Sequence, residues 1–150
     1  MNILFPELEK LVPSLHLNSV YTLLEELPGA DYIAGCHLTH LKKLLESSSK
    51  GRYSRDKAIE IRNAAIDSIG TPMDAKSMEL RHTIHLIWIL SEEIEEIEAS
   101  IKAIMDEMQS PIMTIPGISY RMGAMILAEV GDFANFDSPD KILAYAGLSP

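Results

Sequence analysis

The feature that most constrains the fold is an uninterrupted helical pattern that begins after Thr71-Pro72 and continues to about Gln109. Neither glycine nor proline breaks it. Its apolar residues recur at alternating steps of three and four, the spacing of coiled coils. They are Leu80, Ile84, Ile87, Leu90, Ile94, Ile97, Ile101, Ile104 and Met108. A helix of roughly 36 residues is on the order of 54 Å long, so we expect it to need a partner that covers it.

Two arrangements of this helix remain open from the sequence. In the first it forms a coiled coil, between molecules or as a hairpin, with the acidic stretch SEEIEEIEAS in the flanking positions. This arrangement predicts a homo-oligomer. Its interface residues are expected to be Leu80, Ile84, Ile87, Ile94, Ile97 and Ile101. In the second, the helix is an ordinary amphipathic helix that packs on its own domain.

The rest of the chain also has helical spacing, which predicts an all-α fold. One helix is expected to begin at a cap residue, Asn18 or Ser19, and another at a Ser54 cap with its end at Gly70. The buried side of the latter is expected to be Ala58, Ile61, Ala65 and Ile69. We predict three regions: a helical region with a basic patch at 1–70, the long coiled-coil helix at 71–109, and a truncated helix-hairpin-helix-like element at 110–150.

Composition indicates a soluble, globular protein. Hydrophobic residues make up 47% of the chain, and no apolar run reaches the roughly 18 residues that a membrane helix needs. The N-terminal stretch has no basic region followed by an apolar core, as an export signal has. One cysteine, Cys36, cannot form an internal disulfide and fits a reducing compartment. We therefore expect a cytoplasmic protein with no membrane partner.

The charge of the chain is unevenly distributed. The net charge is −9, but the segment from Leu41 to Asn63 has seven Lys or Arg and three Asp or Glu, a local net of +4. Because the Debye length is about 8 Å at physiological salt, such a patch can act locally on a polyanion. Its candidate nucleic-acid-binding residues are Lys50, Arg52, Arg55 and Lys57. The alternative is an ordinary solvated helix face.

A second candidate for nucleic-acid binding is a Pro-Gly turn at the start of a helical pattern, in TIPGISYRMGAMILAEVGD at 114–132. Ser119 is expected to cap this helix and Gly131 to end it. The first turn of a helix has N–H groups without partners, and these attract phosphate. The predicted contact residues are Pro116, Gly117, Ile118, Ser119, Tyr120 and Arg121. The alternative is a turn that only joins two packed helices.

These residues also carry a resemblance to a family. The segment 114–150 resembles the start of the C-terminal domain of DEDD-type insertion-sequence transposases, the IS one-ten group, which are guided by a bridge RNA. The upstream stretches FPEL and SSSKGRYSRDKAIEIRNAAIDSIG, with the long acidic helix, are similar to the middle of those proteins. Three signatures occur in order: Ile115-Pro116-Gly117-Ile118, Ala128-Glu129-Val130-Gly131-Asp132 and Ala144-Tyr145-Ala146-Gly147-Leu148.

The resemblance implies a parent protein that transposes DNA, with DNA and a guide RNA as partners. It implies four magnesium-binding acidic residues in an N-terminal ribonuclease-H-like domain, and a nucleophilic serine beyond the Ala-Gly-Leu-x-Pro segment. Both positions are expected to lie outside residues 1–150. Ser149 does not match the nucleophile, so no catalytic residue, metal ligand or cofactor is assigned in this chain, and magnesium is expected for the full-length parent.

Two other constellations suggest metal sites. The pairs His37/His40 and His82/His85, with Cys36, have spacing compatible with zinc, although buried structural histidines are commoner. Four acids at the C-terminal end could suggest magnesium but more often stabilise helix ends: Glu129, Asp132, Asp137 and Asp140. Three function classes therefore remain. The leading one is a transposase fragment for assembly and backbone binding; the others are an acidic coiled-coil interaction module without nucleic-acid affinity, and a metal-dependent enzyme that uses the histidines.

Overall fold

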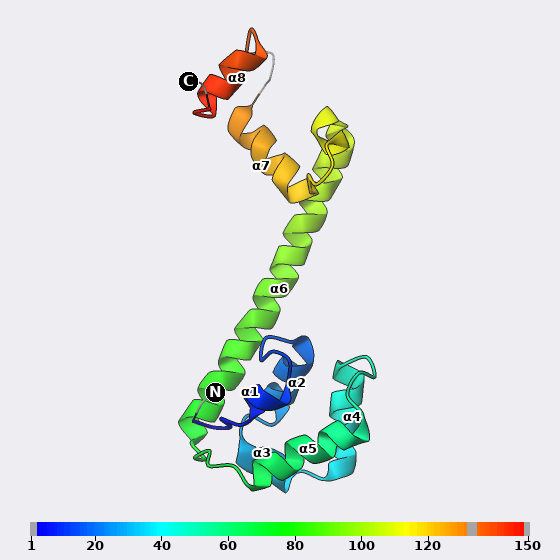
Figure 1. The fold of residues 1–150 in the computed structure, drawn as a ribbon, viewed down its shortest axis with the longest axis vertical. Helices are drawn as coiled ribbons and strands as arrows, with labels where there is room; N and C mark the ends of the chain where they lie inside the picture. Colours follow the sequence, from blue (N-terminus) through cyan, green and yellow to red (C-terminus); the bar gives the residue numbers. More distant parts are fainter. Residues whose placement is uncertain (1–2, 132–134, 149–150) are drawn as a thin grey trace. The chain divides into compact units, whose positions relative to one another are not determined.

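The computed structural model describes residues 3–131 and 135–148, and every regular element in this part of the chain is a helix (Figure 1). The predicted all-α fold is confirmed. The elements in chain order are α1 (Leu8–Leu11), α2 (Asn18–Glu26), α3 (Ala30–Gly35), α4 (Leu38–Ser48), α5 (Arg55–Ile66), α6 (Asp74–Met108), the 3₁₀ helix η1 (Pro111–Thr114), α7 (Tyr120–Val130) and α8 (Pro139–Tyr145). They form two units, Met1–Leu90 and Ser91–Pro150, with the boundary inside α6.

The first unit has a hydrophobic core to which α1 to α5 and the first part of α6 contribute. Helix α3 packs on α5, and α2 packs on α4. The fully buried large side chains of this core include Phe5, Leu8, Val20, Leu23, Ile33, Leu41, Leu45, Ile61 and Ile84. The spacing of Leu41 and Leu45 in α4, and of Ala58, Ile61 and Ala65 in α5, places each set on one helix face. For α5, periodicity therefore predicted three of the four buried residues correctly, namely Ala58, Ile61 and Ala65.

The end of α5 differs from the prediction. The helix ends at Ile66, and Ile69 is 84% exposed instead of buried. The reason is a backbone contact with the N-terminal segment. The N–H of Thr71 donates to the carbonyl of Ile3 at 2.8 Å, and a Cβ atom at Gly70 would lie 2.4 Å from the carbonyl oxygen of Leu4. Gly70 is thus required for close approach of two chain segments and not for ending the helix.

The first part of α6 packs in the core of the first unit. Ile84 is 1% exposed, and Leu80 is partly buried against the same core. Polar contacts fix this part of α6 to the end of α2: Arg81 donates from Nε to the carbonyl of Glu25 at 3.0 Å, and Trp88 Nε1 donates to the Glu25 carboxylate at 3.2 Å. Ile84 therefore belongs to the chain's own core, and its assignment to an oligomer interface was wrong. Leu80 is partly used by the same core.

The apolar stripe that α6 leaves exposed runs on a different face. Its members are Leu86, Leu90, Ile94, Ile97, Ile104 and Met108. An α-helix has 3.6 residues per turn, so a pattern with steps of three and four drifts by about 20° per heptad around it. The predicted coiled-coil seam therefore combined residues from two faces of α6: the face that is buried in the first turns and the face that is exposed in the later turns. Four of the six predicted interface residues, Ile87, Ile94, Ile97 and Ile101, stay a prediction.

The second unit pairs the C-terminal part of α6 with α7. Gly123 of α7 is buried, and a Cβ atom there would lie 2.9 Å from Met113 Sδ and 3.1 Å from Met105 Cε. A larger residue at this position would push the helix away. Helix α8 is tied to α7 by the hydroxyl of Tyr145, which donates to the carbonyl of Glu129 at 3.3 Å. Over the described residues, no helix is long and apolar enough to cross a membrane.

Candidate nucleic-acid interface

The Pro-Gly hairpin lies between η1 and α7 in the second unit. Gly117 has φ +89°, a left-handed conformation that residues with a Cβ atom rarely adopt. The N–H of Ile118 donates to the carbonyl of Ile115 at 3.2 Å and closes the turn. Ser119 is the N-cap of α7, as predicted, and its hydroxyl accepts from the N–H of Met122 at 3.2 Å. Gly131, also as predicted, ends the helix with φ +71°.

The hairpin leaves several amides open. Within the described chain, the N–H groups of Gly117, Ser119, Tyr120 and Arg121 have no hydrogen-bond partner. The Ile118 amide is used inside the turn, so its prediction as a phosphate-binding donor is corrected. Pro116 has no N–H and contributes only its fixed φ angle. The open N–H groups of Ser119, Tyr120 and Arg121 follow from helix geometry, because the first turn of a helix has no internal acceptors for them, whereas that of Gly117 belongs to the turn.

Carboxylates lie beside these amides. Arg121 Nη1 is 3.2 Å from Glu98 Oε1, and both side chains are exposed. The hydroxyl of Tyr120 donates to Asp106 Oδ1 at 2.7 Å, while Lys102 pairs with Asp106 and lies 4.9 Å from the centre of the Tyr120 ring. Exposed ion pairs contribute about 0–1 kcal/mol, so a phosphate can replace Glu98 as the partner of Arg121 at little cost.

The ionisation of this cluster is set by its hydrogen bonds. The pKa of Asp106 is lowered, first by the hydrogen bond from Lys102 and then by that from Tyr120. The hydrogen bond to Asp106 raises the pKa of Tyr120, and the pKa of Lys102 is raised by its hydrogen bond to Asp106. At neutral pH the cluster has two cations and two carboxylates, counting Arg121 and Glu98. Attraction of an anion must therefore come from the helix N-terminus and its amides.

A surface groove of about 530 Å³ runs along this cluster. It is lined by Glu98, Ala99, Ile101, Lys102, Ser119, Tyr120 and Arg121. The predicted contacts Ser119, Tyr120 and Arg121 are thus brought together at one surface. Sequence reasoning missed Glu98, Lys102 and Asp106, which act on these residues from α6. The one sequence signal for them was the spacing of Lys102 and Asp106, which are four residues apart and can form an ion pair on a helix.

The predicted basic patch lies in the first unit, on the loop after α4 and at the start of α5. Lys57 pairs with Glu60 at 2.9 Å, so its charge is partly compensated. In the described residues, Lys50, Arg52 and Arg55 form no ion pair with an acidic side chain. Lys50 has a left-handed backbone with φ 53°, unusual for a residue with a side chain. Of the four residues of the predicted basic patch, Lys50, Arg52 and Arg55 are thus the ones whose charge is available to an anion.

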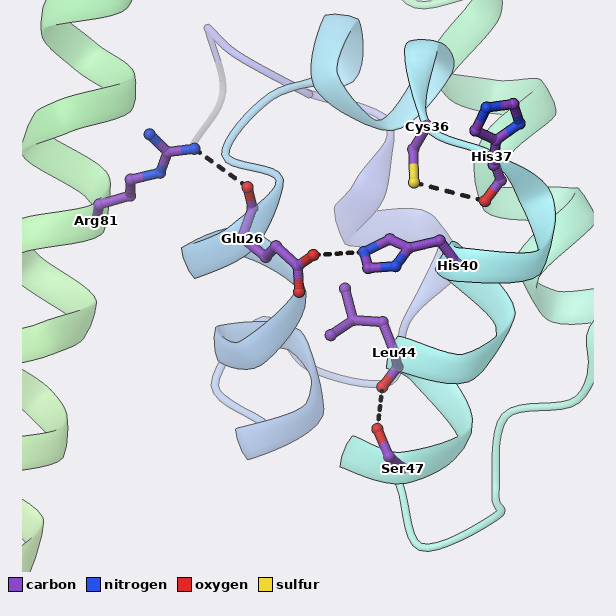
Figure 2. A network of polar contacts seen from close by, with 7 residues as sticks. All are labelled: Glu26, Cys36, His37, His40, Leu44, Ser47 and Arg81. Carbon is purple, nitrogen blue, oxygen red and sulfur yellow. Dashed lines mark hydrogen bonds and ion pairs between the residues drawn. The ribbon is translucent and has the colours of Figure 1, made fainter.

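The two histidine pairs and Cys36 form no metal cluster in the part of the chain that the structure describes. Figure 2 shows the contacts of the first pair: His40 pairs through Nε2 with the carboxylate of Glu26, and the thiol of Cys36 donates to the carbonyl of His37 at 3.5 Å. Arg81 donates to the carbonyl of Glu26 at 3.1 Å in the same network. The structure therefore does not bring these residues together as a zinc site. Asp132 and Ser149 lie outside the described residues.

Comparison with known proteins gives two similarities. Residues 109–150, which include η1, the hairpin, α7 and α8, match the family described as "Transposase IS116/IS110/IS902 family". A wider similarity is found with the "Insertion element IS110 uncharacterized 43.6 kDa protein" of Streptomyces coelicolor, which is 29% identical over 160 residues. That alignment covers 97% of this chain and 37% of the relative, so the chain spans little more than a third of the relative's length. No solved structure matches significantly. Both similarities support an IS110-type transposase.

Proposed function

We propose that this chain is part of the transposase of an insertion element, and that it contributes oligomerisation and nucleic-acid backbone binding to DNA transposition. The observation that carries the proposal is that the transposase similarity at residues 109–150 contains the whole hairpin with its open amides. A donor-rich turn at a helix N-terminus suits a polyanionic ligand. Two observations support the proposal: a surface with donors suited to phosphate, and similarity to proteins that are named as belonging to mobile elements.

The hairpin would bind one phosphate of the nucleic-acid backbone. The N–H groups of Gly117, Ser119, Tyr120 and Arg121 would donate to the phosphate oxygens, and the Arg121 guanidinium would exchange Glu98 for the phosphate. Contacts of this kind fix the position of a strand but read no base. Binding by this element is therefore weak and indifferent to sequence.

Strand chemistry is assigned to the parent protein and not to these residues. By the resemblance, the magnesium-binding acids and the nucleophilic serine lie outside residues 1–150, and the bridge RNA is a partner of the complete transposase. A serine nucleophile needs an activating group and the acids need their metal before a strand is cut. The present chain supplies the surface that holds the backbone and the helix that joins subunits.

Two substitutions test the hairpin. Gly117→Val forces a β-branched residue into a left-handed turn, and Arg121→Glu reverses a charge beside the amides. Each is expected to weaken binding of a labelled DNA duplex about tenfold, since hydrogen bonds to charged groups contribute about 1.5–3 kcal/mol. Fluorescence anisotropy at low salt measures the affinity, and circular dichroism confirms that helix content is retained.

The matched controls are Gly131→Val and Lys76→Glu. Gly131 has the same kind of left-handed backbone at the other end of α7, and Lys76 carries the same charge in a different unit, paired with Glu79. Both are expected to leave the affinity near that of the original chain. If the original chain and both hairpin variants bind DNA equally well, the hairpin does not contact nucleic acid and serves only as a turn between helices.

A second function is favoured by the exposed stripe of α6. Apolar side chains such as Ile94 and Ile97 lie among the glutamates of SEEIEEIEAS and are more than half exposed. This is also the surface of an acidic coiled-coil interaction module without nucleic-acid affinity. The two functions differ in one observable, because only backbone binding releases counterions and so depends on salt.

A further inference from the structure

A second groove, of about 480 Å³, lies in the first unit between the start of α2 and the loop after α4. Its lining includes Asn18 and Ser19 from α2, and Ser49, Lys50, Arg52 and Tyr53 from the loop. None of the described residues that line this groove is acidic, although the chain as a whole has a net charge of −9. The groove is therefore a local site of positive potential.

The N-terminus of α2 is open toward this groove. Its N-cap is Leu17, which has no side chain that could accept a hydrogen bond, and no acidic residue lies in the first turn. The N–H groups of Val20 and Tyr21 both donate to the carbonyl of Leu17. Those of Asn18 and Ser19 have no partner in the part of the chain described. By contrast, α7 satisfies one of its first amides with the Ser119 hydroxyl.

Two hydroxyl groups that line the groove also have no partner. The Ser19 side chain is on a residue only 7% exposed and makes no hydrogen bond with any described residue. The hydroxyl oxygen of Tyr53 is buried and is likewise without a partner among the residues described. An unsatisfied buried polar group costs about 1–3 kcal/mol, so the buried Tyr53 hydroxyl needs an explanation. A ligand with oxygen acceptors supplies one.

The loop that carries the cations is held in place. The N–H of Gly51 donates to the carbonyl of Glu46 at 2.9 Å, and the N–H of Tyr53 donates to the Ser49 hydroxyl at 2.9 Å. Lys50 and Arg52 stand on either side of Gly51 and line the groove. Strained left-handed backbone at Lys50 persists because these bonds impose it. The loop backbone thus holds two residues whose cationic side chains form no ion pair with a described acidic residue, and both line the same groove as the N-terminus of α2.

We propose that this groove binds one nucleotide of a nucleic-acid strand by its phosphate. The phosphate oxygens accept from the amides of Asn18 and Ser19 and from the Ser19 hydroxyl, and Lys50 and Arg52 balance the charge. The groove volume lies in the range of about 300–1,000 Å³ for ligand sites, which leaves room for more than the phosphate alone. This inference rests on the proposed nucleic-acid binding and adds a backbone contact in a different unit from the hairpin.

The test uses the whole ¹⁵N-labelled chain, titrated with inorganic phosphate and with a short oligothymidylate. We expect both probes to shift the amide resonances of Asn18 and Ser19. The double variant Lys50→Ala/Arg52→Ala is expected to bind the oligonucleotide about tenfold more weakly, in line with loss of charge-assisted contacts. The control Lys42→Ala/Lys43→Ala removes the same charge from α4, outside the groove lining, and is expected to change the affinity less than twofold.

The failures of this inference and of the proposed function are distinguishable. Suppose that the original chain binds the oligonucleotide, that the two double variants bind equally well, and that the Asn18 and Ser19 resonances do not move. The proposed site in this groove is then wrong, while the proposed function, backbone binding by another surface, is retained. If phosphate shifts those resonances while the oligonucleotide does not bind, the site serves a free phosphate and the nucleic-acid assignment is overturned. If neither probe moves them, no anion site exists there.

Discussion

Replacing Ile84 by Asp is expected to unfold the first unit. Ile84 is 1% exposed and lies among the apolar side chains of α1 to α5. A buried carboxylate without a partner costs several kcal/mol, in a domain whose total stability is about 5–15 kcal/mol. The only tryptophan, Trp88, lies in the same unit against Tyr21 and reports its unfolding. Urea denaturation followed by tryptophan fluorescence should give a lost or strongly lowered midpoint.

The control for this prediction is Met78→Asp. Met78 is on the same helix, outside the exposed stripe, and is 57% exposed, so the added carboxylate remains in water. Its urea midpoint is expected to equal that of the original chain. Equal midpoints for Ile84→Asp and Met78→Asp would contradict the assignment of Ile84 to the core.

Replacing Ile94 and Ile97 by Asp is expected to dissociate an oligomer. Both residues belong to the exposed stripe of α6, with exposures of 51% and 57%. Exposed apolar surface of this kind marks an interaction site, and two charges in the contact would cost a few kcal/mol. Light scattering should give a mass above the 16.7 kDa of one chain for the original protein, and the mass of one chain for the variant.

A double substitution on another face of α6, Ser100→Asp with Ala103→Asp, is the matched control because it adds the same two charges. It is expected to leave the mass unchanged. The acidic residues that flank the stripe repel one another between copies, so association should strengthen as salt screens them. A mass of one chain for the original protein at micromolar concentration would exclude this interface.

The elements that follow from local chemistry could be predicted from the sequence. The Ser119 cap and the end of α7 at Gly131 each depend on backbone preferences of residues within one or two turns. The length of α6 follows equally from the absence of glycine and proline between its ends. These features need no knowledge of what the helix packs against.

What could not be predicted depends on contacts between distant segments. The choice of which face of α6 is buried is made by residues such as Glu25 and Tyr21, more than fifty positions away. The exposure of Ile69 follows from the strand-like contact of Thr71 with Ile3. The carboxylate beside Arg121 comes from Glu98, on another helix. The groove at Asn18 is likewise formed with a loop about thirty residues later in the chain. Hydrophobic periodicity gives no information on which distant segments lie together.

The most direct test of the central claim is the salt dependence of DNA binding by the unmodified chain. A labelled duplex is titrated with protein at several salt concentrations between about 50 and 200 mM, a range over which phosphate contacts lose affinity. We expect log affinity to fall linearly with log salt, with a slope of about −0.9 for each phosphate contacted, and to be the same for duplexes of unrelated sequence. No binding at the lowest salt, or an affinity that salt does not change, would contradict the claim and leave the acidic coiled-coil module as the function of this chain.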